Sequence, residues 1–329
     1  MESYYLFSSG NLQLKDNVIR LTTAEGRYKD LMIEQTRDIY LFGEVTTNTK
    51  CLNYLSQNKI PLHLFNHYGY YAGSFYPREA NVSGKLLIEQ VKAELDLEKR
   101  LYIAQKLVDS AAHNCLRNLQ YYRTRGKDVN AEIAQIKALR KEIPRSKNIH
   151  ELMGIEGDWH AVYYSAWPAI FNTNTGFTKR VRRPPDNLVN TLLSFLNMLT
   201  YSACLSEIYV SQLNPTISYL HTPSERRFSL SLDISEIFKP LLVDRLIFTL
   251  VNKKMITEKD FELGSNNCYL KESGQQKVLH QFDDRLKQTI MDKNLHRKVS
   301  YRRLMRLECY RLIKYLLGEE EYEPFKMWW

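Results

Sequence analysis

The first 79 residues alternate short apolar runs with turn-forming residues, a pattern typical of β-strands. Apolar and aromatic runs at residues 4–7, 17–21, 38–42 and 61–65 are bounded by Gly, Asn or Asp. A further strand-like stretch over 67–73 contains two glycines, which indicate a bend or bulge. One short helix over about 47–58 is expected between the strands. The pattern predicts a small β-rich domain over residues 1–79.

From about residue 85 the apolar positions recur with the period of an α-helix. A long amphipathic stretch ends near Gly126, and a helix over 129–142 is stopped by Pro144. Further helices are predicted over 156–170, 187–211, 233–252, 257–262, 272–292 and 299–316. The expected fold class is α+β: the β-rich domain, a linker over 80–85, and a larger all-helical domain over 86–329. The acidic and then aromatic segment 318–329 is expected either to dock on this domain or to remain loose.

The most apolar window, 188–210, is about long enough to cross a bilayer. Asn190, Ser194, Asn197 and Tyr201 interrupt it at helical spacing, which favours a polar stripe on a soluble helix. The first residues show no basic stretch leading into an apolar one, so we expect no secretory signal and a cytoplasmic protein. The five cysteines are far apart with no C-x-x-C spacing, which predicts buried thiols in a reducing compartment.

The formal net charge of +9 is compatible with nucleic-acid binding but does not establish it. Clustering is more informative, because the segment 179–183 places four cations in five positions directly after an apparent turn. This segment is either a solvated loop or a phosphate-binding loop. The abundant tyrosines, 22 in number, suit wet interfaces or stacking on unpaired bases, although most are expected to be ordinary packing residues.

The first candidate for metal chemistry is Glu156, which stands between Gly154 and Gly157 at the start of a predicted helix. A carboxylate in a first turn is often there only to complement the helix dipole. The flanking glycines favour a site, because they would let a ligand approach the carboxylate closely. His160 follows one turn later and could be a ligand, but we expect it to play a structural or supporting part.

A second set of metal-competent residues follows at His221, Asp233 and Glu236. Asp233 and Glu236 are three residues apart and share a helix face, where two carboxylates repel unless a cation or proton lies between them. The alternative is that Asp233 caps a helix and Glu236 completes a capping box. A site of Glu156, His221 and Glu236 would suit Mg²⁺ or Mn²⁺, with the imidazole favouring Mn²⁺. There is no Walker loop, G-x-G-x-x-G or G-x-S-x-G element, which argues against an NTPase, a dinucleotide enzyme and an α/β-hydrolase.

Four ordered motifs carry a family resemblance. They are G-I-E-G at 154–157, R-P-P-D-N-L-V-N-T-L-L-S at 183–194, L-H-T-P at 220–223 and S-L-S-L-D-I-S-E-I-F-K-P at 229–240. In these motifs the chain resembles the universal CRISPR-associated endonuclease of the spacer-acquisition module, and overall similarity suggests a type I system such as I-B. The resemblance covers essentially the whole chain. It implies an N-terminal β domain that forms homodimers and a helical catalytic domain that works with the second, smaller universal CRISPR-associated adaptation protein.

The resemblance also implies an activity and roles for individual residues. Members of the family are metal-dependent integrases that join the 3′-hydroxyl ends of short DNA fragments to the leader-proximal repeat of a CRISPR array by transesterification. The metal ligands carry over to Glu156, His221 and Glu236, where the glutamate at 236 replaces a common aspartate. Asp233 takes a supporting place, as a ligand of a second metal ion or as a hydrogen-bond partner of the first ligands.

Candidates for DNA binding are cationic residues near these motifs and one amide. The resemblance places the amide, Asn190, near the active site, whereas a helix-packing hydrogen bond is the alternative. The cations are candidates for contacts with the DNA backbone. The predicted DNA-binding set is Arg182, Arg183, Asn190, Arg226, Arg227 and Lys239.

Two other functions remain open on the sequence. One is a nuclease that cuts branched or single-stranded DNA without integrating it. The other is a non-catalytic nucleic-acid-binding protein in which the polar residues merely cap and pair.

Overall fold

The computed structural model describes residues 2–66, 68–78, 81–182, 184–223, 228–264, 267–292 and 295–329. Two compact units divide the chain. The first consists of Met1–Val82 together with Leu270–Leu279, and the second of Ser83–Tyr269 together with His280–Trp329. The segment 270–279 therefore packs with the β-rich unit, although it follows most of the helical unit in sequence.

The first unit is built on two four-stranded sheets within its described residues. One sheet has the order β1-β5-β7-β8, in which β8 is the antiparallel strand, and the other has the order β4-β3-β2-β6. The strands of the first sheet are β1 (Glu2–Leu6), β5 (Thr36–Leu41), β7 (Leu62–Phe65) and β8 (Tyr71–Phe75). Those of the second are β2 (Gly10–Lys15), β3 (Val18–Thr22), β4 (Tyr28–Leu31) and β6 (Val45–Thr47).

Helix α1 (Thr49–Gln57) contributes to the core of this unit. Asn48 caps it by accepting a hydrogen bond from the backbone of Cys51 at 2.9 Å. Inward-facing residues such as Leu12, Ile19 and Leu55 are completely buried. The predicted β-rich character of the N-terminal region is confirmed. The strands β2, β4 and β6 were not predicted. They are short and half polar, so backbone pairing defines them and no run of apolar residues marks them in the sequence.

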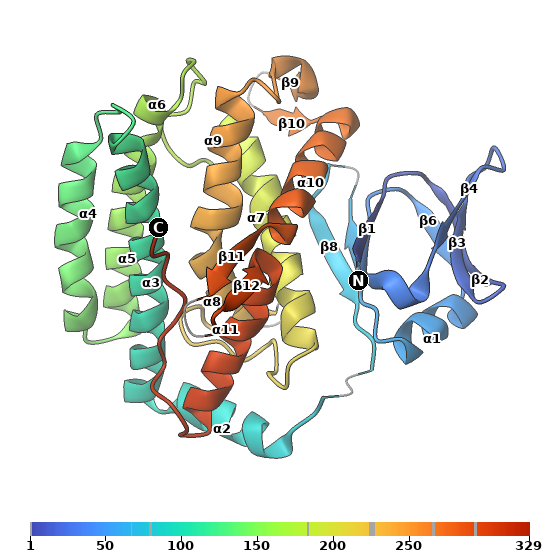
Figure 1. Ribbon diagram of the computed structural model, residues 1–329, viewed down its shortest axis with the longest axis horizontal. Helices are drawn as coiled ribbons and strands as arrows, with labels where there is room; N and C mark the ends of the chain where they lie inside the picture. Colours follow the sequence, from blue (N-terminus) through green and yellow to red (C-terminus); the bar gives the residue numbers. More distant parts are fainter. Residues whose placement is uncertain are drawn as a thin grey trace. The chain divides into compact units, whose positions relative to one another are not determined.

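The second unit is mainly helical (Figure 1). Its long helix α3 (Leu97–Arg123) packs against α2, α4, α5 and α8. The α-helices of the chain beyond α1 and α3 are α2 (Gly84–Leu95), α4 (Asn130–Glu142), α5 (Ile149–Ser165), α6 (Trp167–Ile170), α7 (Leu188–Tyr209), α8 (Ser229–Lys239), α9 (Arg245–Asn252), α10 (Glu272–Lys287) and α11 (Tyr301–Leu316). A π-helical turn over Pro240–Asp244 joins α8 directly to α9.

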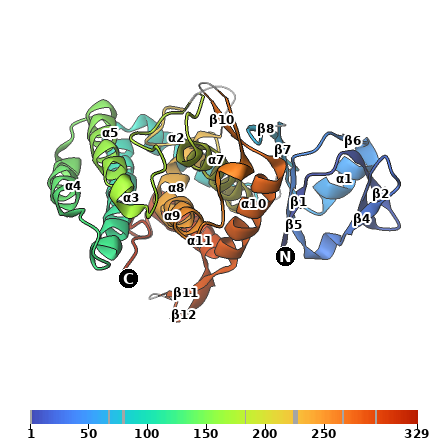
Figure 2. The same ribbon diagram turned by 90° about the horizontal axis from the view of Figure 1, so that it is seen from above.

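The α+β class is confirmed, and the second unit also contains short strands that were not predicted. Strands β9 (Phe261–Leu263) and β10 (Cys268–Leu270) form one hairpin, and β11 (Thr289–Asp292) pairs with β12 (Arg297–Ser300) in another. The second hairpin extends away from the helices in Figure 2. The helix predicted over 272–292 therefore ends at Lys287, and the one predicted over 257–262 is a short 3₁₀ turn followed by β9.

Three other helix boundaries differ from the prediction. The amphipathic stretch after residue 85 is two helices, because Asp96 ends α2 and caps α3. The helix predicted to start at Glu156 begins at Ile149, where Asn148 caps it. The helix predicted to start at Asp233 begins at Ser229. Glycines are poor helix formers, so Gly154 and Gly157 indicated a helix start although α5 runs through both.

Helix α7 is long and apolar enough to cross a bilayer by length and composition, and 72% of its most apolar window is buried inside the protein. It packs against α8 and α11 as a core element of the second unit. All five cysteines are buried and free, which confirms the prediction of buried thiols.

The C-terminal segment docks on the second unit along α3. Ser110 donates a hydrogen bond to the carbonyl of Phe325 at 2.5 Å, and Arg117 donates to that of Trp329 at 3.0 Å. Glu308 of α11 is fully buried and accepts hydrogen bonds from the Tyr322 hydroxyl at 2.8 Å and the backbone of Phe325 at 2.9 Å. Of the two predicted alternatives, docking is confirmed.

Replacing Glu308 is expected to release this segment. E308A would leave the Tyr322 hydroxyl and the Phe325 amide buried without partners, at an expected loss of about 3 kcal/mol of unfolding free energy. Urea unfolding and limited trypsin digestion after Lys326 would measure the loss. E319A, at an exposed position beside the same segment, is the control. Equal stability of the two variants would contradict the role assigned to Glu308.

Candidate metal centre

Helix α5 presents a carboxylate and an imidazole from successive turns. Glu156 and His160 lie on one face of the helix, and His160 Nδ1 is 2.6 Å from Glu156 Oε1. Both side chains are about one quarter exposed. A Cβ atom added at Gly154 or Gly157 would meet nothing within 4 Å, so no neighbouring group crowds α5 at either glycine. Glu156 stands in the middle of α5, which excludes the alternative of a first-turn carboxylate.

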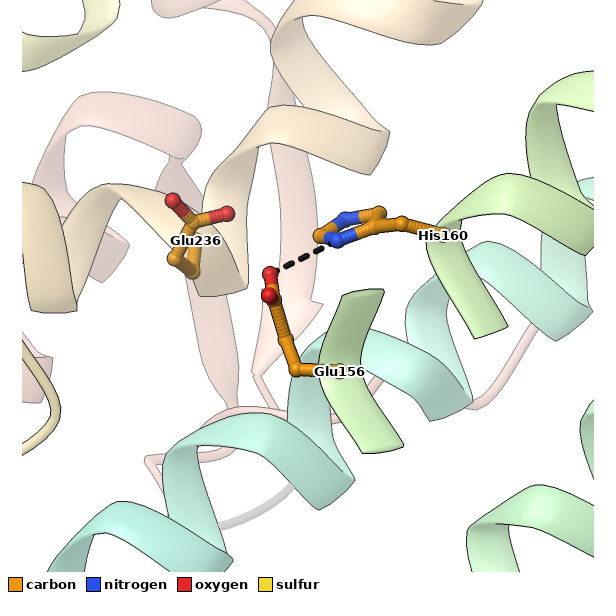
Figure 3. A group of neighbouring side chains, drawn as sticks. All are labelled: Glu156, His160 and Glu236. Carbon is orange, nitrogen blue, oxygen red and sulfur yellow. Dashed lines mark ion pairs between the residues drawn. The ribbon is translucent and has the colours of Figure 1, made fainter. Parts of the chain in front are cut away.

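Helix α8 brings a second carboxylate to the same place. Ligand atoms of Glu156, His160 and Glu236 all lie within 4.8 Å of one another. Figure 3 shows Glu236 facing the Glu156–His160 pair from the neighbouring helix. Two carboxylates and an imidazole at this separation fit a divalent cation with oxygen and nitrogen ligands. The sequence expectation gave His160 a structural or supporting part, whereas the structure places it directly in the cluster.

The ionisation of Glu236 is governed by burial and by nearby cations. Burial opposes its charge, but the charges of Lys239, His160 and His221 together lower the pKa of Glu236 below its usual range. Lys239 also donates a hydrogen bond to Oε1 of Glu236 from the next turn of α8. Glu236 therefore stays anionic and available as a ligand.

Asp233 holds the segment that carries His221. Its Oδ2 accepts hydrogen bonds from the backbone of Tyr219 at 2.7 Å and Leu220 at 3.0 Å, and its Oδ1 lies 2.8 Å from His221 Nδ1. Burial lowers the pKa of His221, but the hydrogen bond and charge of Asp233 outweigh it and raise that pKa. Because a carboxylate can only accept, Nδ1 carries the proton and Nε2 of neutral His221 is left for a metal.

Asp233 lies inside α8 and is completely buried, so it does not cap the helix. Its contacts match one of the two supporting roles expected for it, that of a hydrogen-bond partner for His221. The capping alternative is wrong because α8 starts one turn earlier than predicted.

The predicted DNA-binding residues lie in different environments. Asn190 is completely buried, and its amide bonds to Asp186, the carbonyl of Lys179 and the backbone of Val181, so it holds the loop before α7 and makes no helix-packing bond among these contacts. Arg182 is exposed. Arg183, Arg226 and Arg227 lie outside the described residues.

Asp244 is a buried titratable residue that the sequence did not single out. It lies in the π-helical turn and accepts a hydrogen bond from the Tyr163 hydroxyl at 2.9 Å. Burial raises the pKa of Asp244 to about 7, although Tyr163, His160 and Lys239 act in the opposite direction. Asn118 bridges the same network, since it donates to the Tyr163 hydroxyl at 3.1 Å. The only signal in the sequence was the adjacent charged pair Asp244 and Arg245 in a mainly apolar stretch.

Comparison with known proteins identifies the family. The family model described as "CRISPR associated protein Cas1" matches residues 4–284. The CRISPR-associated endonuclease Cas1 of Fusobacterium nucleatum is 52% identical over 99% of this chain and 97% of its own length. The chain belongs to the Cas1 family.

Solved structures agree with this assignment. A Cas1 protein from Thermotoga maritima superposes with a TM-score of 0.89 at 40% identity, over 99% of this chain and 100% of that one. A casposase bound to its integration product has the same fold, with a TM-score of 0.89 at 20% identity over 98% and 93% of the two chains. The expected family membership is confirmed, and the subtype remains a prediction.

The raised pKa of Asp244 predicts a pH-dependent stability for the metal-free protein. The folded state keeps this proton up to about pH 7, whereas an aspartate in the unfolded chain loses it near its ordinary pKa of 3.8. Wild-type stability should therefore fall as pH rises through this interval.

The variant D244N has no carboxyl group to titrate at this position. We therefore expect its unfolding free energy to gain about 4 kcal/mol relative to wild type between pH 4 and pH 8. Urea unfolding in chelator measures this, with D158N at an exposed site of α5 as the control. Parallel stability curves for D244N and wild type would refute the assignment.

Proposed function

We propose that this Cas1-family chain is a metal-dependent DNA endonuclease and integrase that inserts short DNA fragments into a CRISPR array. The observation that carries the proposal is the convergence of Glu156, His160 and Glu236 within 4.8 Å in a chain of this family. The reaction would be transesterification, in which the 3′-hydroxyl of the fragment attacks a phosphodiester of the repeat. The hydroxyl oxygen forms the new ester bond to phosphorus and gives up its proton, while the old ester bond breaks and the departing oxygen takes up one proton, so that no proton is gained or lost overall.

The proposed metal ligands are Glu156, Glu236 and His221, with Mg²⁺ or Mn²⁺ as the cation. A bound divalent ion would polarise the phosphoryl oxygen and stabilise the departing oxyanion. The chain's own part is to keep Glu236 ionised, to fix the tautomer of His221 through Asp233, and to offset charge through Lys239. His160 is the competing imidazole, since it already contacts Glu156 at 2.6 Å.

DNA and protein partners complete the proposal. The exposed Arg182 and the cations Arg183, Arg226 and Arg227 would position the phosphate backbone. Lys239 would contact DNA only after releasing Glu236. We further propose a homodimer formed through the β-rich unit and a complex with the second, smaller CRISPR-associated adaptation protein, as the resemblance implies.

The proposed chemistry is tested by removing one ligand at a time. We expect E156Q, E236Q and H221A each to lose at least 100-fold in joining a fragment with free 3′-hydroxyls to a plasmid carrying leader and repeat, while DNA binding persists. Joining by H221A at the wild-type rate would refute the metal-site assignment. Cleavage of branched DNA without any joining would instead indicate a nuclease that does not integrate, and binding without either reaction a non-catalytic binding protein.

The two imidazoles can be separated by metal binding itself. If His221 is the ligand and Asp233 fixes its tautomer, H221A and D233N should each weaken Mn²⁺ binding by about 10–100-fold, and H160A should weaken it less. Mn²⁺ titration followed by electron paramagnetic resonance gives these affinities without relying on activity. A larger loss in H160A than in H221A would move the ligand role to His160.

A further inference from the structure

A cationic pocket lies in the second unit, between α3, α4 and the C-terminal segment. Its volume of about 700 Å³ is in the range of pockets that hold small ligands or parts of larger ones. Figure 1 shows α3 and α4 side by side, with the C-terminal segment along α3. Among the described residues that line it, the cationic ones are Lys106, Lys137, Arg140, Lys141 and Lys326, and the acidic one is Asp109. None of the metal-centre residues lines it.

Part of this positive charge is already neutralised. Both oxygens of Asp109 are engaged, because Arg140 Nη2 lies 3.0 Å from Oδ2 and Lys326 Nζ lies 2.7 Å from the same oxygen, while Arg140 Nε contacts Oδ1. Lys106 pairs with Glu323 of the C-terminal segment. These pairs occupy the side of the pocket formed by α3 and the C-terminal segment.

The side formed by α4 keeps its charge. Lys137 and Lys141 are one helical turn apart on the same face and exposed, and neither pairs with a carboxylate in the part of the chain that the structure describes. Beside them, the exposed Pro144 and the half-buried Tyr102 of α3 supply apolar lining, with the buried Ile143 beneath. The pocket thus offers two free ammonium groups above an apolar surface.

The free cations belong to a basic segment that leads toward the metal centre. Lys137, Arg140, Lys141, Arg145 and Lys147 stand within eleven residues, with Glu142 as the only acid among them. The segment ends where α5 begins, and Glu156 lies about 10 Å further along that helix. A row of cations is suited to the repeating phosphates of a nucleic-acid strand, whereas an isolated peptide carboxylate would use only one of them.

We propose that this pocket binds a DNA strand outside the metal centre, with a phosphate on Lys137 and Lys141 and the attached sugar or base against Pro144 and Tyr102. The inference rests on the proposed function, because it takes DNA as the substrate. The pocket would fix the strand at a second point and so align the strand that enters the metal centre.

Charge removal gives the first test. K137Q/K141Q is expected to weaken binding of a fluorescent DNA fragment about tenfold at 0.1 M salt and to reduce the slope of log affinity against log salt by about 1 to 2. The matched control is K253Q/K254Q, which removes two exposed lysines at the end of α9. An affinity and salt slope equal to those of the control would overturn the proposal.

The assay of strand joining separates this inference from the proposed function. If the wild-type protein joins strands and K137Q/K141Q binds DNA as the control does, only the pocket assignment fails. If the wild-type protein joins no strands and the double variant still loses DNA affinity, the pocket assignment stands and the proposed activity fails.

Site-directed crosslinking gives a direct readout. The five native cysteines are buried, so a cysteine placed at position 141 can be labelled selectively with a thiol-reactive photocrosslinker. We expect K141C to crosslink to DNA, and Q135C, an exposed position of the same helix outside the pocket, to do so at least tenfold less. Equal crosslinking from both positions would overturn the proposal. Binding of polyglutamate at K141C without any DNA crosslink would show that the pocket serves an acidic protein instead.

Discussion

The mutual repulsion of two carboxylates is the constraint on which the metal centre depends. Glu156 and Glu236 present ligand atoms within 4.8 Å, and like charges at that distance must be offset by positive charge. Lys239, one turn along α8, supplies part of it, and His160, one turn along α5, contacts Glu156 directly. A divalent cation would satisfy the same requirement more fully. The repulsion that these neighbouring cations offset is the same repulsion that a bound divalent cation would offset.

Such a repulsive arrangement persists only on a rigid scaffold. The carboxylates stand on α5 and α8, which both pack against α3, and the segment from α8 to α9 is a continuous helical path through the π-helical turn. That turn carries Asp244, and the network of Asn118, Tyr163 and Asp244 ties α3 and α5 to it. Helix α3 also anchors the C-terminal segment on another of its faces. The basic pocket lies where α3, α4 and this segment meet.

The sequence predicted most of the fold, because apolar periodicity reports directly on which face of an element is buried. It was less successful at the starts of α5 and α8, and the reason is local chemistry. Gly154 and Gly157 resemble helix breakers, and Asp233 resembles a cap, yet Asn148 caps α5 and α8 starts at Ser229. The half-polar strands β2, β4 and β6 escaped detection because backbone pairing, rather than a run of apolar residues, defines them.

For the site, the sequence by itself determined which metal-competent side chains are present: the carboxylates at 156, 233 and 236 and the histidines at 160 and 221. It also determined the family to which the chain belongs. Only the tertiary structure decided which residues from different segments surround each of these side chains. It brought Glu236 of α8 to Glu156 and His160 of α5, turned Asp233 toward His221, buried Asn190 and enclosed Asp244. Spacing along the chain fixes neighbours within a helix, but contacts between helices depend on how their faces pack, and no local pattern encodes that.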